Sequence, residues 1–246
     1  MNEQCDMLVL SYKEYREHDA LICGLSEQGK INLIARGANK GNSKNAGAIQ
    51  PYSLARILYN AHEQRSLYTL KTAQGLKSRR HLREHLLLSA IASLICEIVV
   101  SQTMDEGSEY FKIVDTCLDA LEKGTQPYGV LCLFLALHLR MQGIYPEVEG
   151  CVRCGSREHI QGISICDGGF VCHSCYRCED DRKRTKEQLK KFRLINHAAI
   201  EHLSIIDDSA SWDYEDADIL LSLLSEYGNA ALKSAVFLKN ISKFTY

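Results

Sequence analysis

Residues 20–36 read ALICGLSEQGKINLIAR, and this stretch decides the fold of the first third of the chain. Two short apolar runs lie on either side of Gln28-Gly29, a pair typical of a tight turn. Each run has the length of a strand, and polar residues interrupt it as in a half-buried strand. The stretch therefore predicts two strands joined by a hairpin.

Three more runs of strand length flank this hairpin, at residues 7–10, 52–59 and 66–71. Five strands without a helix-length pattern between them favour a small closed barrel, because closure leaves no exposed edge. A five-stranded OB-fold is the expected form. Residues 37–47, after the third strand, are rich in Gly and Asn, so we expect a mobile loop without an apolar anchor.

Helical periodicity begins after Ser78, where apolar residues recur at every fourth position: Leu82, Leu86, Ala90, Leu94 and Ile98. Further helices are expected over residues 106–122, 128–141, 185–203 and 214–239, the last broken at Gly228. The fold class is therefore α+β with several domains. An N-terminal five-stranded OB-fold barrel spans residues 1–78, and an α-helical domain spans residues 79–246 and carries an insert at 148–178.

Eleven of the 246 residues are cysteines, an odd number. The start of the sequence is polar and acidic and lacks the segments of a signal peptide. No apolar run approaches the roughly 18 residues of a membrane helix, so no membrane association is expected. We therefore expect a cytoplasmic protein, in which disulfides are rare and clustered cysteines are better explained as metal ligands.

Two C-x2-C pairs in the insert, Cys151/Cys154 and Cys172/Cys175, are separated by 17 residues. Each pair can present two thiolates to one ion from a tight turn, and together they complete a tetrahedral zinc site. The apolar residues around Asp167 predict a hairpin between the pairs, which is the layout of a zinc ribbon. Four thiolates close the coordination shell, so we expect one structural Zn²⁺ and no catalysis by it.

Spare ligands leave this assignment open. Cys178 forms a further C-x2-C with Cys175, and Cys166, His159 and His173 also lie in the insert. Any of them could replace one of the four cysteines. The remaining cysteines are most simply small core residues: Cys5, Cys23, Cys96, Cys117 and Cys132.

The formal net charge of −2 conceals an asymmetry. Residues 1–80 contain 12 Lys or Arg against 7 Asp or Glu, and within residues 29–80 ten basic residues face one acid, Glu63. A compact basic domain of this kind attracts polyanions. The alternative is an ordinary solvated basic surface.

Signatures of several enzyme classes are missing from the sequence, including H-E-x-x-H, G-x-S-x-G and the zinc-deaminase pattern. No histidine stands at motif spacing from a cysteine or serine. We therefore expect a non-enzymatic protein, with a zinc or thiol enzyme as the disfavoured alternative.

The order of these parts resembles a known family. Its local matches are residues 8–10 with 19–22, Gly29-Lys30-Ile31, residues 35–38, Gln50-Pro51-Tyr52 and residues 150–155. Together with the barrel, the helical domain and the cysteine insert, they make the chain similar throughout its length to RecO, the bacterial recombination mediators. Not every RecO protein keeps the four cysteines, so the zinc prediction depends on the spacing in this sequence.

The resemblance implies a DNA-repair protein that binds single- and double-stranded DNA and anneals complementary strands. It also implies partners: RecR, the C-terminal tail of single-strand-binding protein, and indirectly RecA, which the family helps to load onto coated DNA. A bacterial, nucleoid-associated location follows.

Sequence-independent DNA binding requires cations that neutralise phosphates. The basic strand-and-loop region of the family matches Arg36, Lys40 and Lys44 here, and the other candidates are Lys30, Arg56, Lys71, Arg79 and Arg80. Tyr52, Tyr59 and Tyr68 are possible base-stacking residues, although core packing is the better explanation for each.

The tail site is expected in an apolar groove with a basic rim. Lys186, Lys190, Lys191 and Arg193 compete for that rim with Arg182, Lys183 and Arg184. The alternative to the mediator as a whole is a zinc-ribbon protein–protein adaptor without DNA-binding activity.

Overall fold

The computed structural model describes residues 2–61, 66–102, 107–208, 211–228 and 232–243. The chain forms two compact units. The first contains residues 1–124 together with 232–238, and the second contains residues 125–231 together with 239–246.

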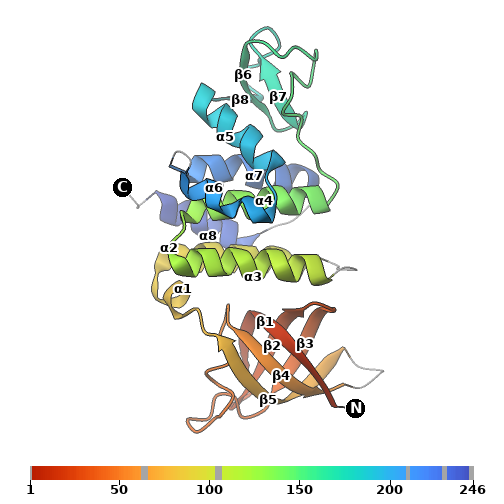
Figure 1. Cartoon of the computed structure of the whole chain (residues 1–246), viewed down its shortest axis with the longest axis vertical. Coiled ribbons are helices and arrows are strands. Elements are labelled where there is room, and N and C mark those ends of the chain that lie inside the picture. The colour runs from red at the N-terminus through yellow and green to blue at the C-terminus, as the bar shows by residue number, and fades with distance from the viewer. Residues whose placement is uncertain (1, 62–65, 103–106, 209–210, 229–231, 244–246) are drawn as a thin grey trace. The chain divides into compact units, whose positions relative to one another are not determined.

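The first unit contains a closed five-stranded barrel (Figure 1). Its strands are β1 (Asn2–Tyr15), β2 (Asp19–Ser26), β3 (Gly29–Ala35), β4 (Leu54–Asn60) and β5 (Leu67–Lys77). They pair in the order β1-β2-β3-β5-β4, with β3 and β5 parallel and the other pairs antiparallel. Gly29, with a φ of 119°, closes the β2–β3 turn in a conformation that favours glycine. The predicted OB-like barrel and its hairpin are confirmed.

Strand alternation builds the barrel core. In β3, Ile31, Leu33 and Ala35 are buried while Asn32 between them is exposed. The segment between β3 and β4 also contributes to the core, because Ala38 and Ile49 are buried in the same cluster. This segment therefore has apolar anchors, contrary to the prediction.

Three helices follow the barrel in the same unit: α1 (Arg80–Glu84), α2 (Leu86–Ser101) and α3 (Gly107–Lys123). The prediction of one continuous helix through Leu82 and Ile98 is wrong, because His85 is extended and separates α1 from α2. The Glu122 carboxylate of α3 accepts the backbone N–H groups of His81 and Leu82. Glu122 thereby satisfies donors that the first turn of a helix leaves unpaired, and it holds α1 against α3.

The linker residue Arg79 joins the barrel to α3. Its side chain is 1% exposed, and all three of its nitrogens donate hydrogen bonds. Nε donates to Asp119 at 2.8 Å, Nη1 to the Tyr52 carbonyl at 2.8 Å, and Nη2 to Asp115. Lys77 Nζ donates to the same two aspartates at 2.7 and 2.6 Å. Two cations from the end of the barrel thus share two carboxylates of α3.

The β2–β3 turn approaches α3 and α2 at the same end of the barrel. A Cβ on Gly107, at the start of α3, would lie 2.1 Å from the Gly29 nitrogen, so the close approach requires glycine there. Lys30 Nζ donates to the Val100 carbonyl at 2.9 Å and also to the Gln102 carbonyl, at the C-terminal end of α2. A cation at that position is favoured by the helix dipole.

The second unit is built around α4 (Pro127–Met141), which is buried nearly all round as the sequence predicts. Around it pack α5 (Lys186–His197), the short helix α6 (Leu203–Asp208) and α7 (Tyr214–Gly228). A single 3-10 turn, η1 (Ile200–His202), precedes α6. The final helix, α8 (Lys233–Ser242), begins in the first unit, where the Glu97 carboxylate accepts the N–H groups of Lys233 and Ser234. The predicted break at Gly228 is confirmed.

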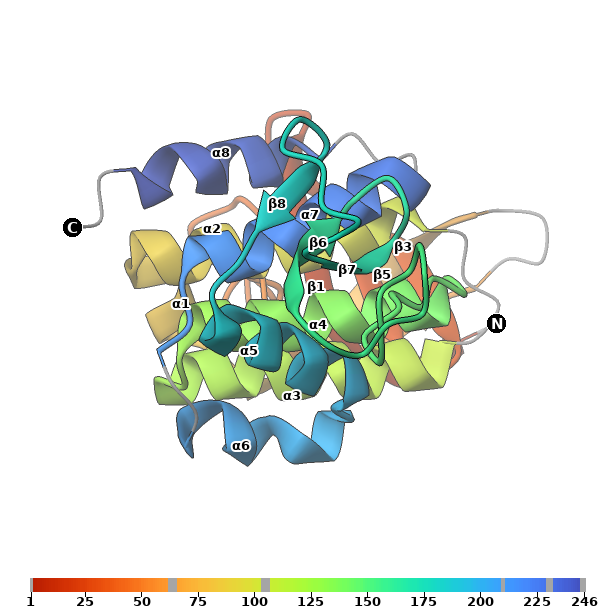
Figure 2. The same cartoon turned by 90° about the horizontal axis from the view of Figure 1, so that it is seen from above.

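The insert forms a three-stranded sheet in the order β7-β6-β8, from β6 (Ile160–Ser164), β7 (Gly169–Cys172) and β8 (Asp181–Lys183). Figure 2 shows the chain passing directly from β8 into α5. Thr185 begins α5 with a capping box, in which its side chain and that of Gln188 each accept the other's backbone N–H. The predicted domain boundary after residue 78 stays a prediction. In the structure, α1, α2 and α3 belong to the same compact unit as the barrel.

Replacing Arg79 is expected to destabilise the first unit. Arg79→Ala leaves two partly buried carboxylates without their shared guanidinium, and we expect a loss of about 3 kcal/mol in the free energy of unfolding. Urea unfolding measures it. The matched control is Arg80→Ala, whose exposed pair with Glu84 should contribute less than about 0.5 kcal/mol.

The same variant should change the response to acid. Burial opposes ionisation of Asp119, but hydrogen bonds from Lys77 and Arg79 outweigh it and lower the pKa of Asp119 below its ordinary 3.8. The stability from this ionised carboxylate is complete above pH 3.8 and is lost as the pH falls through the lower folded value. The gap between wild type and Arg79→Ala should therefore narrow in acid. If the difference in unfolding free energy between wild type and Arg79→Ala stayed constant in acid, the ionised Asp119 carboxylate would not contribute to that difference.

Candidate nucleic-acid surface and metal centre

The barrel end opposite α2 and α3 is built from the β1–β2 turn and the start of the segment after β3. The Gly37 N–H donates to Asp19 Oδ1 at 2.9 Å, and Asn39 Nδ2 donates to the Asp19 carbonyl at 3.0 Å. Tyr12 Oη also donates to the Asn39 side chain. These bonds hold the first residues of the segment against the β1–β2 hairpin.

Farther along, Asn45 ties the segment to β5. Its Nδ2 donates to the Lys71 carbonyl at 3.2 Å, and its Oδ1 accepts the Ala73 N–H at 3.0 Å. The segment is thus fixed along its length by side-chain hydrogen bonds and by buried Ala38 and Ile49. Its cations therefore have defined positions on the barrel.

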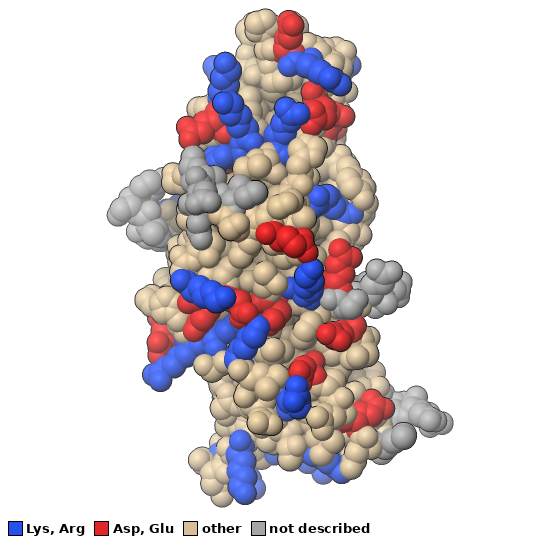
Figure 3. Space-filling model, in the orientation of Figure 1, with Lys and Arg blue, Asp and Glu red and all other residues tan. Residues whose placement is uncertain are grey.

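Three of the predicted DNA-binding residues stand on this segment as exposed side chains: Arg36, Lys40 and Lys44. The contacts of the described residues show no ion pair for any of them. Figure 3 shows, for the face it draws, Lys and Arg interspersed with Asp and Glu over much of the surface. Cations of this kind are available to an external polyanion.

The other predicted residues are engaged to different degrees. Arg79, in the linker before α1, is buried against α3, and Lys30 donates hydrogen bonds to carbonyls at the end of α2. Neither side chain can bind a phosphate without breaking these hydrogen bonds. Arg56 makes a bidentate pair with Asp6, at 2.7 and 3.0 Å. Lys71 donates to Asn2 at 2.7 Å, and Arg80 pairs with Glu84 while staying largely exposed. The structure thus separates the eight candidates into free and engaged groups.

Two exposed cations escaped the sequence analysis. Arg16 lies in the β1–β2 turn with its guanidinium 5.0 Å from the centre of the Tyr15 ring, and Lys13 is exposed on β1. Lys13 also lines an open groove of about 370 Å³ with Ser11 and with Asn32 of β3. The alternation of β1, which places Ser11 and Lys13 on one face, was the signal that could have identified Lys13.

The three tyrosines considered for base stacking are better explained by packing. Tyr52 and Tyr59 are buried, at 7% and 6% exposure, and Tyr68 is half-buried against Tyr59 with 5.5 Å between the ring centres. Tyr59 Oη also donates to Glu3 at 2.8 Å. Burial of the ring faces leaves Tyr52 and Tyr59 unavailable to a base.

The four predicted cysteine ligands come together in the insert. The sulfurs of Cys151, Cys154, Cys172 and Cys175 all lie within 4.8 Å of one another, and those of Cys154 and Cys172 are 3.7 Å apart. A tetrahedron with metal–sulfur bonds of about 2.3 Å has sulfur–sulfur edges of about 3.8 Å. The cluster therefore has the size of a four-thiolate metal site. Neither Cys166 nor Cys178 belongs to it, and both are exposed.

The electrostatics of the cluster also fit a bound cation. Burial opposes ionisation of Cys151, but backbone N–H groups of Cys172, Arg153 and Cys154 outweigh it and lower the pKa of the Cys151 thiol to about 6. Hydrogen bonds that the Cys175 thiol makes with the sulfurs of Cys154 and Cys172 favour its protonated form and raise its pKa to about 12. Four thiolates at this spacing therefore require a positive ion between them, which a divalent metal supplies.

The apolar surface around the cysteines is small. The buried cluster that contains them consists of Cys151, Val171 and Cys172, with partly buried side chains packed around it, while Ile163 and Phe170 of the insert are buried elsewhere, Phe170 against Phe192 of α5. A metal bound by the four sulfurs would add a cross-link at this small cluster. The four-cysteine cluster is thus a core element of the insert as well as a ligand set.

Metal removal is expected to destabilise the insert. Cys151→Ser should bind less metal than wild type and lower the melting temperature by about 5 °C or more. Metal analysis after purification without chelator, combined with thermal melts, tests this. Cys166→Ser, which changes an exposed cysteine outside the cluster, is the control. Wild type with less than half an equivalent of metal, or unchanged melts of Cys151→Ser, would contradict the metal site.

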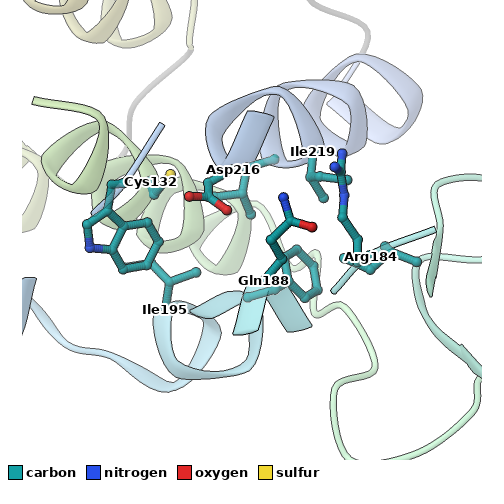
Figure 4. A pocket seen from close by; sticks show the side chains of 10 residues that line it. Cys132, Arg184, Gln188, Ile195, Asp216 and Ile219 are labelled. Carbon is teal, nitrogen blue, oxygen red and sulfur yellow. The ribbon is translucent and has the colours of Figure 1, made fainter. Parts of the chain in front are cut away.

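The second unit also contains a small cavity of about 10 Å³, lined by residues of α4, α5, α7 and β6. Figure 4 shows the Gln188 amide and the Asp216 carboxylate directed into this space, with Cys132 behind them. Such a volume holds one water molecule at most. The cavity is therefore too small for an organic substrate.

Among the described residues, no helix is long and apolar enough to cross a membrane.

Comparisons with known proteins agree with this architecture. The family model for the N-terminal part of Recombination protein O matches residues 1–79, and the model for its C-terminal part matches residues 83–234. The chain is 28% identical over 250 residues to the DNA repair protein RecO of Bacillus subtilis (strain 168), which covers 100% of this chain and 97% of the relative. Similar relatives include the DNA repair proteins RecO of Bacillus velezensis and Listeria monocytogenes.

The B. velezensis protein is 29% identical over 242 residues, covering 97% of this chain and 94% of the relative. The L. monocytogenes protein from serotype 4b is 24% identical over 249 residues, covering 98% of this chain and 96% of the relative. These similarities extend over the barrel, the helices and the cysteine insert alike. The chain belongs to the RecO family of DNA repair proteins.

Proposed function

We propose that this protein is a recombination mediator that binds DNA, anneals complementary single strands and, with RecR, helps to load RecA onto DNA coated by single-strand-binding protein. The observation that carries the proposal is the exposed group Arg36, Lys40 and Lys44 on the segment after β3, without an ion pair among the described residues. Its place of action would be the bacterial cytoplasm, in association with the nucleoid.

DNA binding by these residues follows from counterion release. Each phosphate that a Lys or Arg neutralises frees condensed cations, which makes the affinity depend strongly on salt and little on sequence. Tyr52 and Tyr59 are buried, so charge rather than base stacking would supply most of the affinity. Such a surface binds single and double strands alike.

Annealing requires no bond-forming group. Two complementary strands repel each other through their phosphates, and a cationic surface that holds both lowers this repulsion. The defined positions of the segment after β3 keep its cations together on one side of the barrel. The proposed activity is therefore binding and alignment, with pairing left to the bases.

The tail of single-strand-binding protein is proposed to bind the second unit. An apolar pocket of about 220 Å³ lies there between Leu194, His197, His202 and Trp212. Lys190 lies one helical turn before the exposed Leu194, on the same side of α5, and Lys186 precedes it by another turn. An apolar pocket beside free lysines fits an acidic peptide with apolar side chains.

The competing cations of the predicted rim are engaged within the unit. Lys191 is buried with Asp216, and Arg193 pairs with Glu149. Arg182 donates to Asp218 at 2.6 Å, and Arg184 pairs with Glu215 at 3.0 Å. Of the original seven, this leaves Lys183, Lys186 and Lys190 exposed and outside ion pairs in the part of the chain that the structure describes. Of these three, Lys186 and Lys190 lie on the helix that lines the pocket.

The DNA surface is tested by a triple variant, Arg36→Ala, Lys40→Ala and Lys44→Ala. We expect about 100-fold weaker DNA binding at 0.1 M salt and a salt slope reduced by about 3, because about one counterion is lost per contact. Fluorescence anisotropy over a salt series measures both, and an annealing assay with and without single-strand-binding protein measures the activity.

The control removes three exposed lysines outside the barrel, with Lys123→Ala, Lys183→Ala and Lys239→Ala. It makes the same change in net charge and should leave DNA affinity within about threefold, since distant charges are screened. Equal affinity of wild type and the barrel variant would refute the proposed surface. A wild type that binds its protein partners but no DNA at low salt would favour the adaptor.

The tail site is tested by Leu194→Glu and Lys190→Glu with a labelled tail peptide. Each variant places a negative charge at the proposed contact, and we expect the affinity to fall about tenfold, or about 1.4 kcal/mol. Lys183→Glu, on β8, should leave it within twofold. If Lys183→Glu weakened peptide binding more than Leu194→Glu and Lys190→Glu, the peptide would bind at β8, and the proposal that it binds the pocket would be wrong.

A further inference from the structure

Arg153 lies in the turn between Cys151 and Cys154, but its side chain crosses to other parts of the insert. Nη1 donates to the carbonyl of Cys175 at 2.5 Å. Both terminal nitrogens also bind Asp181 of β8, at 2.6 and 2.8 Å. One side chain therefore connects the first cysteine pair with the second pair and with the strand that follows it.

The remaining donors of Arg153 reach the β6–β7 hairpin. Nε donates to Asp167 Oδ2 at 2.8 Å, and Nη2 donates to Ser164 Oγ at 3.3 Å. Ser164 Oγ in turn donates to the same Asp167 oxygen at 2.9 Å. The guanidinium is thus held in one plane by carboxylates on two sides, which suits its forked geometry.

Asp181 is the most buried partner, since its side chain has no exposure. It accepts the backbone N–H of Arg177 at 2.7 Å in addition to the two bonds from Arg153. Asp181 lies six residues after Cys175, and its bond to the Arg177 N–H reaches the segment that directly follows the second cysteine pair. A buried carboxylate with these bonds has one geometry, because any other leaves its charge unpaired.

The buried apolar cluster around the cysteines contains Val171 besides Cys151 and Cys172. The arginine network adds a second connection between the two cysteine pairs, through hydrogen bonds that do not involve the sulfurs. Partners outside the coordination shell orient metal ligands, and removing them typically weakens metal binding by about 10- to 100-fold. Ordering of the ligands before metal binding lowers the entropy that binding must overcome.

We infer that Arg153, together with Asp181, is a positioning element of the four-cysteine site, which holds the two cysteine pairs at the separation that the metal requires. The inference depends on the metal site proposed above. Neither Arg153 nor Asp181 belongs to the four-cysteine ligand cluster.

The experiment measures zinc affinity of the full chain by competition with a chelating dye. Arg153→Gln should bind zinc about 10- to 100-fold more weakly than wild type. Arg153→Lys keeps the charge but not the forked geometry and should recover only part of the affinity. Arg157→Gln is the matched control, because Arg157 is an exposed arginine of the same insert, and its affinity should stay within twofold.

Two further measurements separate positioning from general stability. Cobalt-loaded protein should show the same tetrahedral thiolate spectrum in wild type and Arg153→Gln at saturating metal, since the ligands are unchanged. Asp181→Asn should weaken zinc binding as Arg153→Gln does, and the double variant should add little, because both changes break one network.

The outcomes distinguish the two proposals. A wild type with less than half an equivalent of zinc overturns the metal site and this inference with it. A wild type that binds zinc, with Arg153→Gln and Arg153→Lys within twofold of it, overturns the positioning role alone. Arg153→Gln could also lower the melting temperature by the same amount in the zinc-loaded and the zinc-free protein. This result would overturn the positioning role as well, because Arg153 would then stabilise the fold without affecting metal binding.

Discussion

The buried guanidinium of Arg79 is the constraint on which the first unit depends. It stands between the barrel and α3, and it satisfies the Tyr52 carbonyl and two carboxylates at once. A cation at 1% exposure is tolerated only with partners of this kind, so Asp115 and Asp119 must face the barrel. The orientation of α3, and through Glu122 that of α1, follows from this requirement.

This constraint divides the basic residues of the barrel into two groups. One group lies at the end of the barrel that meets α2 and α3 and consists of Lys30, Lys77 and Arg79. These side chains donate hydrogen bonds to carbonyls and carboxylates of the helices. Arg36 and Lys40 stand at the opposite end, beside the β1–β2 turn. The basic excess of the first 80 residues is therefore partly structural, and only the remainder can serve a polyanion. The net charge of −2 has little bearing on that remainder.

In the insert, a cluster of four cysteines with the size of a metal site takes the place that a helix interface has in the first unit. Its four cysteines were identifiable because metal ligands on a tight turn have a short, characteristic spacing. The sequence did not determine which four of the eight candidate ligands form the cluster, since Cys178 stands in the same C-x2-C pattern as Cys175. The fold resolves it by placing the Cys178 side chain outside the cluster of sulfurs. Arg153 could be read in the sequence only as the residue between two cysteines; its partners appear in the folded insert.

The sequence by itself determined the features that depend on neighbouring residues. Strand alternation and the Gln28-Gly29 turn indicated the barrel, apolar periodicity indicated α4, and cysteine spacing indicated the metal ligands. Only the tertiary structure decided which cations are free. Lys77 and Asp115 are 38 positions apart, and Arg79 and Asp119 are 40 apart. Pairs at such separations are set by packing of whole elements, because the energy of an ion pair depends on distance in space and leaves no periodic trace in the chain.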